Sequence, residues 1–156
     1  MAKYDSILFN SGFAVGSTVY DDHYPGDDEQ NRIVLNVALE GQKGTAVKMI
    51  VDSGAPWCIL NPRLLEEGNL VSEVNYSHTT KLNIRGEIRW GHLIRANVIL
   101  KAMNGENLKV EATFFVPFME SDEVWNYPNF LGLGGFLDRI RYAVDASENA
   151  FYFGRF

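Results

Sequence analysis

Apolar and polar residues alternate along one segment of the chain, and a second apolar run follows it. From residue 33 to residue 39 every second residue is a large apolar one, residues 41–44 contain two glycines, and residues 45–51 are mainly apolar. A period of two is typical of a strand with one buried face, and a short connection containing glycine is typical of a hairpin. The pattern therefore predicts a β-hairpin whose second strand ends at Asp52.

Three more strand-like runs lie between Thr80 and Val116. They are separated at Arg85-Gly86 and at Asn104-Gly105. Asn-Gly between alternating apolar residues is a strong local hairpin signal. We therefore expect residues 96–100 and 108–114 to pair as a hairpin that turns at Asn104-Gly105.

Helical signals are confined to two short segments. Asn61 is a capping residue, Pro62 stands at the first helical position and Gly68 ends the segment. A second helical turn is predicted near residues 136–140, and strands are predicted at residues 142–144 and 150–153. The absence of a longer amphipathic helix between successive strands argues against a doubly wound fold. The sequence predicts a mainly β chain, folded as a small closed β-barrel with one or two short helices.

The first 31 residues lack any sustained periodicity. They mix apolar residues with glycines and end in an acidic stretch at residues 21–29. This predicts an N-terminal extension ending in a loop, followed by a domain of residues 32–156. A chain of 156 residues with 46% hydrophobic residues is long enough for one compact domain.

Charge and cysteine content exclude several classes of protein. The formal net charge is -6, and no stretch gathers the lysines and arginines that nucleic-acid binding needs. No apolar run approaches the ~20 residues of a membrane span, and the N-terminus lacks the apolar core of a signal peptide. The single cysteine, Cys58, cannot form an intrachain disulfide and suits a reducing compartment. We expect a soluble cytoplasmic protein that binds neither nucleic acid nor membrane.

Metal and cofactor chemistry find little support in the sequence. His23, His78 and His92 do not have the spacing of metal ligands, and the glycines at 132, 134 and 135 lack the lysine of a phosphate-binding loop. We expect no metal and no cofactor.

The clearest chemical signal is the tetrapeptide Asp52-Ser53-Gly54-Ala55 at the end of a predicted strand. Such a tetrapeptide alone occurs by chance in roughly one chain in a hundred of this length. A second element strengthens it, because the apolar pair Phe130-Leu131 followed by Gly132 lies far downstream. The two elements together are more specific than either one.

The order of these parts resembles the retropepsin family of aspartic peptidases, and more narrowly the single-domain bacterial retropepsin-like proteins. The resemblance covers about residues 32–154. It implies that Asp52 is the catalytic aspartate and that the Ser53 hydroxyl braces two halves of a site. Gly54 and Ala55 would let the substrate backbone approach closely.

The resemblance also implies a flap, which is a hairpin that folds over the substrate. It would fall on residues 83–88, with substrate contacts from Ile84, Arg85, Gly86 and Glu87. Its tip departs from the glycine-rich retroviral pattern. Leu131 and Gly132 would form the strand end that packs beneath the Asp52 loop.

Two further positions depart from the retroviral pattern. Retroviral enzymes carry an acid after the small residue of the first motif and an arginine after the glycine of the second, where this chain has Pro56 and Leu133. Replacing both partners of a buried ion pair with apolar residues can be energetically neutral. We therefore expect Pro56, Trp57 and Leu133 to pack where the pair would lie.

Hydrolysis by this route needs two carboxyl groups close enough to share a proton, and aspartic peptidases are the standard example of such coupling. The motif occurs once in the chain. Asp145 imitates it without the glycine and is better explained as a turn residue. The resemblance therefore implies a C2 homodimer with one Asp52 from each subunit.

Two functions follow from this interpretation. The first is an aspartic endopeptidase that cleaves extended peptides. The second is a non-catalytic dimer of the same fold that binds an extended segment of a partner protein by strand addition.

Overall fold

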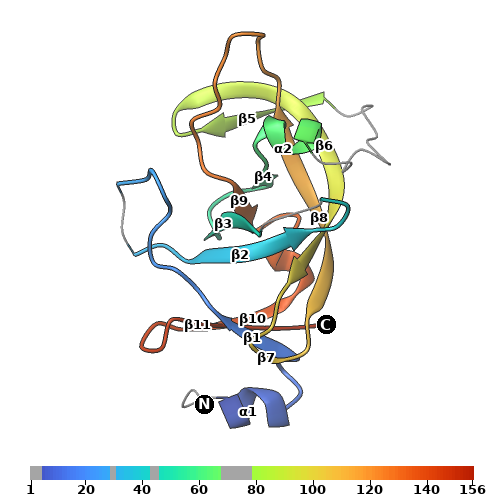
Figure 1. Ribbon diagram of the computed structural model, residues 1–156. Coiled ribbons are helices and arrows are strands. Elements are labelled where there is room, and N and C mark those ends of the chain that lie inside the picture. Colours follow the sequence, from blue (N-terminus) through green and yellow to red (C-terminus); the bar gives the residue numbers. More distant parts are fainter. Residues whose placement is uncertain (1–4, 29–30, 43–45, 68–78) are drawn as a thin grey trace.

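The computed structural model describes residues 5–28, 31–42, 46–67 and 79–156 (Figure 1). The helical elements are α1 (Asp5–Asn10), α2 (Pro62–Glu67) and the 3₁₀ turn η1 (Leu137–Arg139). The strands are β1 (Gly16–Val19), β2 (Val34–Leu39), β3 (Val47–Asp52), β4 (Cys58–Ile59), β5 (Thr79–Ile84), β6 (Glu87–Leu100), β7 (Asn104–Gly105), β8 (Leu108–Pro117), β9 (Phe130–Gly132), β10 (Arg141–Asp145) and β11 (Ala150–Gly154).

The described residues form a closed barrel of six strands. The strand order is β2-β3-β9-β4-β8-β6, and pairing of β6 with β2 closes the ring. Most neighbours are antiparallel, but β3 pairs with β9 and β4 pairs with β8 in parallel. β5 lies outside the ring and pairs with the first part of β6, so the two form a hairpin that extends beyond the barrel (Figure 1). The prediction of a small closed β-barrel is confirmed.

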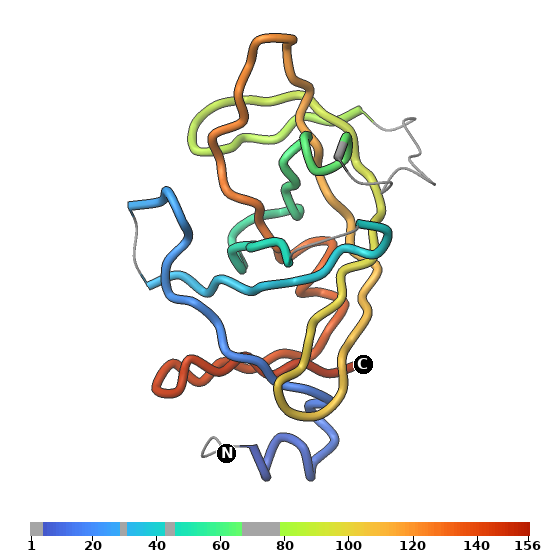
Figure 2. The backbone as a smooth tube through the Cα atoms, viewed as in Figure 1, coloured from blue at the N-terminus to red at the C-terminus, as the bar shows by residue number. Residues whose placement is uncertain are grey.

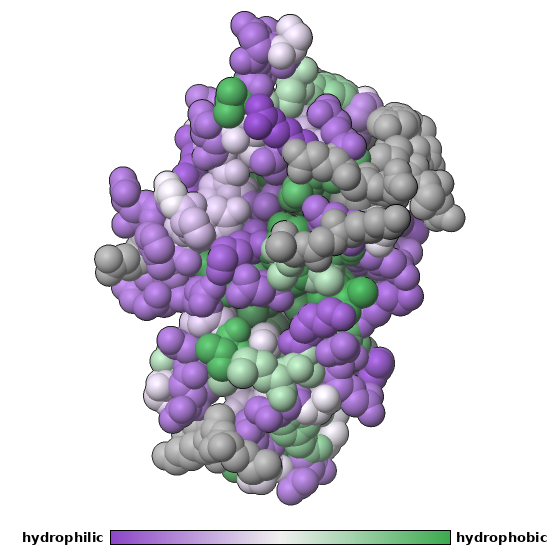
Figure 3. Space-filling model, in the orientation of Figure 1, coloured by the Kyte–Doolittle hydropathy of each residue, from purple (hydrophilic) through white to green (hydrophobic). Residues whose placement is uncertain are grey.

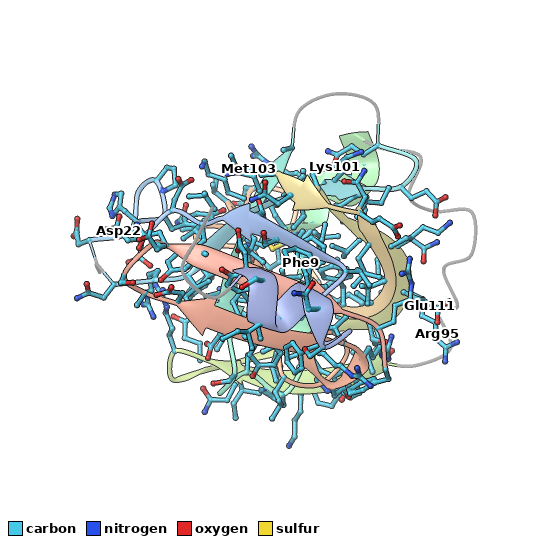
Figure 4. The ribbon with its side chains drawn as sticks, turned by 90° about the horizontal axis from the view of Figure 1, so that it is seen from below. Phe9, Asp22, Arg95, Lys101, Met103 and Glu111 are labelled. Atoms are coloured by element: carbon cyan, nitrogen blue, oxygen red, sulfur yellow. The ribbon has the colours of Figure 1, made fainter. Side chains whose placement is uncertain are left out.

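A second sheet lies below the barrel in the view of Figure 1. Its order is β10-β11-β1-β7, so a strand near the N-terminus pairs with the last strand of the chain. α1 lies across the outer face of this sheet, as Figure 4 shows from below. Phe9 contacts the ring of Tyr152 edge to face, and the Tyr152 hydroxyl donates a hydrogen bond of 2.7 Å to Asp5.

The segment before residue 32 was expected to be an extension ending in a loop, and no helix or strand was predicted in it. It contains α1 and β1, which were missed for a physical reason. β1 has only four residues and begins at Gly16, so no alternation is visible, and its conformation is set by pairing with the distant β11.

One hydrophobic core joins the barrel to the lower sheet. Phe114 of β8 and Phe136 lie in it together with Phe151 and Phe153 of β11, and all four side chains are fully buried. Burial of aromatic side chains of this size is a dominant stabilising term. On the face shown in Figure 3, hydrophilic residues cover most of the surface, and hydrophobic residues gather in its middle and lower parts.

One local prediction, the tight turn at Asn104-Gly105, is wrong. Residues 96–100 and 108–114 do pair within β6 and β8, but Asn104-Gly105 is not a tight turn between them, since it forms β7 and pairs with β1. The two-residue turn lies at Arg85-Gly86, where both φ angles are positive, at 52° and 90°. This is the backbone of a type I′ hairpin turn.

The predicted helix at residues 61–68 is confirmed as α2. The Asn61 side chain accepts a hydrogen bond of 3.0 Å from the Arg63 backbone N–H, as a capping residue does. Gly68 lies outside the described residues, as do Lys43 and Gly44 of the predicted first turn. The helical turn predicted near residues 136–140 is η1, and the last two predicted strands are β10 and β11.

Candidate active site

The two sequence elements that carry the chemical signal meet in the barrel. β3 ends at Asp52 and runs parallel to β9, with Asp52 opposite Gly132. β9 lies between β3 and β4, and the connection from Ser53 to Trp57 joins these two strands around its end. The Asp52 loop therefore rests on the residues that follow β9.

Local hydrogen bonds orient the Asp52 carboxyl group. Gly54 donates its backbone N–H to Asp52 Oδ1 at 2.9 Å, and Ala55 donates to the Asp52 carbonyl oxygen at 3.2 Å. Leu133 donates to the Ala55 carbonyl oxygen at 2.9 Å, which ties the loop to the second element. The side-chain rotation of Asp52 is thereby restricted by the loop that follows it.

Close packing beneath the loop leaves room only for glycine. A Cβ atom on Gly132 would lie 2.4 Å from the Trp57 carbonyl oxygen, and one on Gly134 would lie 2.1 Å from the Pro56 carbonyl oxygen. Both distances are far below van der Waals contact. The glycines after Leu131 and Leu133 thus allow two chain segments to approach at the backbone.

Cys58 is buried under the same loop. Gly132 donates its backbone N–H to Cys58 Sγ at 3.4 Å, and the thiol lies 3.9 Å from the Gly134 carbonyl oxygen. Burial raises the pKa of the Cys58 thiol from 9.0 to about 12. The group is therefore a neutral thiol at physiological pH and serves as a packing residue.

Asp52 lines a cavity of about 190 Å³. The β5–β6 hairpin contributes to the same cavity, so this hairpin and the Asp52 loop face a common space. The lining residues are Arg32, Asp52, Gly54, Ala55, Pro56, Ile59, Leu82, Asn83, Ile84, Arg85 and Phe130.

The structure places the site residues expected from sequence in two groups. Asp52, Gly54, Ala55, Ile84 and Arg85 line the cavity together. The others lie nearby but do not line the part of it that the structure describes: Ser53, Gly86, Glu87, Leu131 and Gly132. Leu131 is fully buried in the core, and the Glu87 carboxylate accepts a hydrogen bond of 3.1 Å from the Tyr127 hydroxyl.

Charged contacts join the hairpin to two other segments. Arg85 lies 3.4 Å from Asp27, and its guanidinium carbon is 5.9 Å from the centre of the Tyr127 ring. Arg89 pairs with Glu87 at 3.2 Å and also with Glu123. The hydrogen bond from Arg89 lowers the pKa of Glu123, and the same contact raises the pKa of Arg89. The hairpin is thus held to the N-terminal segment and to the loop after β8.

Arg32 and Asp27 were not identified from the sequence. Arg32 lines the cavity and lies 3.7 Å from Asp27, whose side chain is only 8% exposed. Figure 2 shows the N-terminal segment rising from the lower sheet to a loop near the hairpin tip. The only sequence signal was the acidic stretch itself, which gives no sign of its distant partner Arg85.

The expected packing of Pro56, Trp57 and Leu133 is wrong for the side chains of Pro56 and Leu133. Trp57 packs against the cluster around Phe130, but Pro56 is exposed and Leu133 is 48% exposed. The contact between the segments is made by backbone groups instead. Ser53 and Gly54 are also exposed, so the surface beside Asp52 carries small and apolar residues.

Two features are absent from the described part of the chain. There, no group of three or more His, Cys, Asp or Glu side chains is arranged to hold a metal ion. In the same residues, no helix has the length and apolar character needed to cross a membrane.

Comparison with known proteins shows similarity to solved structures. No protein-family model matches the chain, and no curated protein matches it. Among solved structures, the chain is similar to a retropepsin-like aspartic protease from Rickettsia conorii, with a TM-score of 0.50 and 16% sequence identity. The match covers 88% of this chain and 98% of that protein. At this identity the similarity shows a retropepsin-like fold.

Proposed function

We propose that the chain forms a homodimer that hydrolyses extended peptides, with one Asp52 carboxyl from each subunit. One observation carries the proposal. Asp52 ends a barrel strand, is oriented by the Gly54 N–H at 2.9 Å and lines a cavity together with a hairpin of the same chain. The retropepsin-like fold is consistent with this role.

The chemistry requires two carboxyl groups that share a proton between them. The ionised carboxylate takes a proton from a water molecule, which attacks the scissile carbonyl carbon. The protonated carboxyl donates its proton to the carbonyl oxygen as the tetrahedral intermediate forms. Collapse of the intermediate breaks the C–N bond, and the proton taken from water passes to the leaving amine. The route requires no covalent bond between the enzyme and the substrate.

The surface beside Asp52 supports assembly with a second copy. Ser53, Gly54, Pro56 and Leu133 are exposed in the single chain, and Leu133 is an apolar residue without cover. The cavity of about 190 Å³ is smaller than the ~300 Å³ at which ligand sites usually begin. A twofold axis next to the loop would join two such cavities and bring two Asp52 side chains together.

In this proposal the β5–β6 hairpin acts as the flap. Ile84 and Arg85 line the cavity and would contact the substrate, and Gly86 with Glu87 completes the flap. Leu131 and Gly132 support the catalytic loop from below, while Ser53 braces the two subunits. The buried thiol of Cys58 is compatible with a reducing compartment such as the cytoplasm.

The test uses the full chain and a degenerate peptide pool from acidic to neutral pH, with new termini detected by mass spectrometry. We expect cleavage by the wild type and a loss of at least about 10³-fold in Asp52→Asn. Asp145→Asn is the matched control, since Asp145 is an aspartate outside the cavity whose carboxylate accepts hydrogen bonds from Ser147 in its own turn. Undiminished cleavage by Asp52→Asn would remove Asp52 from the mechanism.

Oligomeric state provides a second test of the same proposal. Sedimentation equilibrium should show a concentration-dependent dimer, and specific activity should fall on dilution below its dissociation constant. A strictly monomeric, active enzyme would contradict a site shared between subunits.

A second candidate function is a dimer that binds extended peptides without cleaving them. The tethering of the hairpin favours it, because Arg85 is held by Asp27 and Arg89 by Glu123. A hairpin held in this way would restrict access to Asp52. Tight peptide binding with no new termini at any pH would identify this function.

A further inference from the structure

Two arginines from distant segments line the same wall of the Asp52 cavity. Arg32 precedes β2 and Arg85 stands at the tip of the β5–β6 hairpin. Both guanidinium groups approach Oδ2 of Asp27, at 3.7 Å and 3.4 Å. The Asp27 side chain is 8% exposed, whereas those of Arg32 and Arg85 are 26% and 44% exposed.

Both guanidinium groups are positively charged and partly buried, with side chains 26% and 44% exposed. Their attraction for an anion in the cavity is therefore less screened than it would be in open water.

The position of Arg85 is energetically unfavourable for its backbone. Its φ of 52° lies in the left-handed region, where type I′ turns prefer Asn, Asp or Gly. A residue with a Cβ atom is disfavoured there, because the Cβ atom comes too close to the following carbonyl oxygen. The turn is otherwise well formed, since the Asn83 side chain accepts a 2.9 Å hydrogen bond from the Gly86 N–H. An arginine at this tip is therefore better explained by its side chain than by the turn.

The guanidinium of Arg85 is also held in a defined place. It lies near the Tyr127 ring and against Asp27, and Arg85 is one of the residues that line the cavity containing Asp52. A guanidinium group has five N–H donors in a planar fork, which suits bidentate binding of a carboxylate. The contact with Asp27 is made through Nη2 and shows that this guanidinium binds a carboxylate.

We propose that Arg85 and Arg32 form a carboxylate-recognising subsite beside Asp52, so that the protein selects peptides with an acidic group close to the scissile bond. This inference rests on the proposed peptide-binding cleft and names its substrate class. The carboxylate is supplied by a Glu or Asp side chain or by the C-terminus of the peptide, and the experiment separates these sources.

The experiment uses pairs of labelled peptides that are identical except for Glu or Gln next to the central bond. Each pair is made with an amidated and with a free C-terminus. Binding to full-length Asp52→Asn protein is measured by fluorescence anisotropy, and kcat/KM is measured with Asp52 intact. We expect the acidic peptide to be favoured at least about tenfold in each measurement, as for a charge-assisted hydrogen bond.

Variants of Arg85 identify the residue responsible. Arg85→Gln should reduce the Glu-to-Gln ratio to about 1, and Arg85→Lys, which keeps the charge, should retain part of it. The matched control is Arg95→Gln. Arg95 is 72% exposed and pairs with Glu111 at 3.4 Å, neither lines the cavity, and Figure 4 shows the two together at the edge of the molecule. The Arg95 variant should keep the wild-type ratio.

The outcomes distinguish this inference from the proposed hydrolysis. Equal binding and equal cleavage of the paired peptides would overturn the subsite and leave hydrolysis intact. A preference for the acidic peptide in binding, without cleavage by the wild type, would support the subsite and overturn hydrolysis. A preference that follows only the free C-terminus would support the subsite with the peptide terminus as its ligand. A ratio that survives in Arg85→Gln would overturn the assignment to Arg85.

Discussion

Asp52 lies opposite Gly132 in the parallel pairing of β3 and β9, and a Cβ atom on Gly132 would stand 2.4 Å from the carbonyl oxygen of Trp57. The loop that follows the candidate catalytic residue and the second glycine element therefore pack against each other at the backbone. The position of the carboxyl group depends on how closely these backbones approach. Any change that separates them should affect stability and activity together.

Gly132→Ala tests this contact. The added methyl group meets backbone atoms, which cannot rotate away, so we expect a loss of about 3 kcal/mol of unfolding free energy, the upper end for overpacking. Urea denaturation would measure it. Gly12→Ala is the control, because Gly12 has a φ of 73° but open space around a Cβ atom, and only about 1 kcal/mol of backbone strain is expected there. An equal or smaller effect at Gly132 would contradict the close packing.

Asp52→Asn should separate activity from stability. The amide oxygen of asparagine can still accept the hydrogen bond from the Gly54 N–H, so the loop geometry should persist. We expect the unfolding free energy to change by less than about 1 kcal/mol while peptide hydrolysis is lost. Asp52→Ala removes the acceptor and should be the less stable of the two variants. If Asp52→Asn unfolds the protein, its loss of activity says nothing about catalysis, and the orientation argued for the loop is wrong.

The barrel and the Asp52 loop could be predicted because their signals are local. Alternating residues 33–39, the apolar run before Asp52 and the motif Leu131-Gly132 each reflect strands with a fixed burial pattern. The capping Asn61 marks α2 in the same way. A pattern of this kind can be identified from consecutive residues alone.

The remaining features depend on partners far apart in the chain. β1 is a strand because it pairs with β11. Asn104-Gly105 does not form the expected turn, because it pairs with β1 as strand β7. No periodic pattern in the sequence marks the contact between Arg85 and Asp27, and neither residue indicates that the other is its partner. The side chain of Leu133 was expected to be packed but is exposed. The two segments are joined by a backbone hydrogen bond from Leu133 to Ala55 and not by side-chain packing.

Cys58 should be unreactive in the folded protein. Burial raises its pKa to about 12, so the unfolded chain loses the thiol proton near pH 9 while the folded chain keeps it. The favourable contribution of the neutral thiol is complete below pH 9 and falls as the pH rises from 9 towards 12. We expect alkylation by iodoacetamide at pH 8.5 to be at least about 10³-fold slower in native than in urea-unfolded protein. Rapid native labelling would show that the thiol is accessible.

Asp27 should restrain the β5–β6 hairpin. Its nearly buried carboxylate joins Arg85 at the hairpin tip to Arg32 at the barrel. Asp27→Asn removes the charge and should increase amide hydrogen exchange of residues 82–88 by about tenfold, as expected for the loss of a charge-assisted contact. Asp138→Asn is the control, because Asp138 is exposed and its carboxylate accepts from Gly135, far from the hairpin in sequence. Unchanged exchange in the Asp27 variant would show that the ion pairs do not hold the hairpin.

The second tether of the hairpin should respond to pH. Arg89 lowers the pKa of Glu123 below its ordinary value of 4.5, so the carboxylate is favoured when the contact is formed. A lowered pKa means that the stabilisation is complete above pH 4.5 and is lost as the pH falls through the lowered value. We therefore expect protection of the β6 amides near Arg89, corrected for intrinsic exchange rates, to decrease only below pH 4.5. Glu123→Gln should reduce this protection at neutral pH and flatten its dependence on pH, because the ionisable partner is gone. An unaltered pH profile in Glu123→Gln would assign the opening to another group, and Glu87, which also contacts Arg89, would be the next residue to substitute.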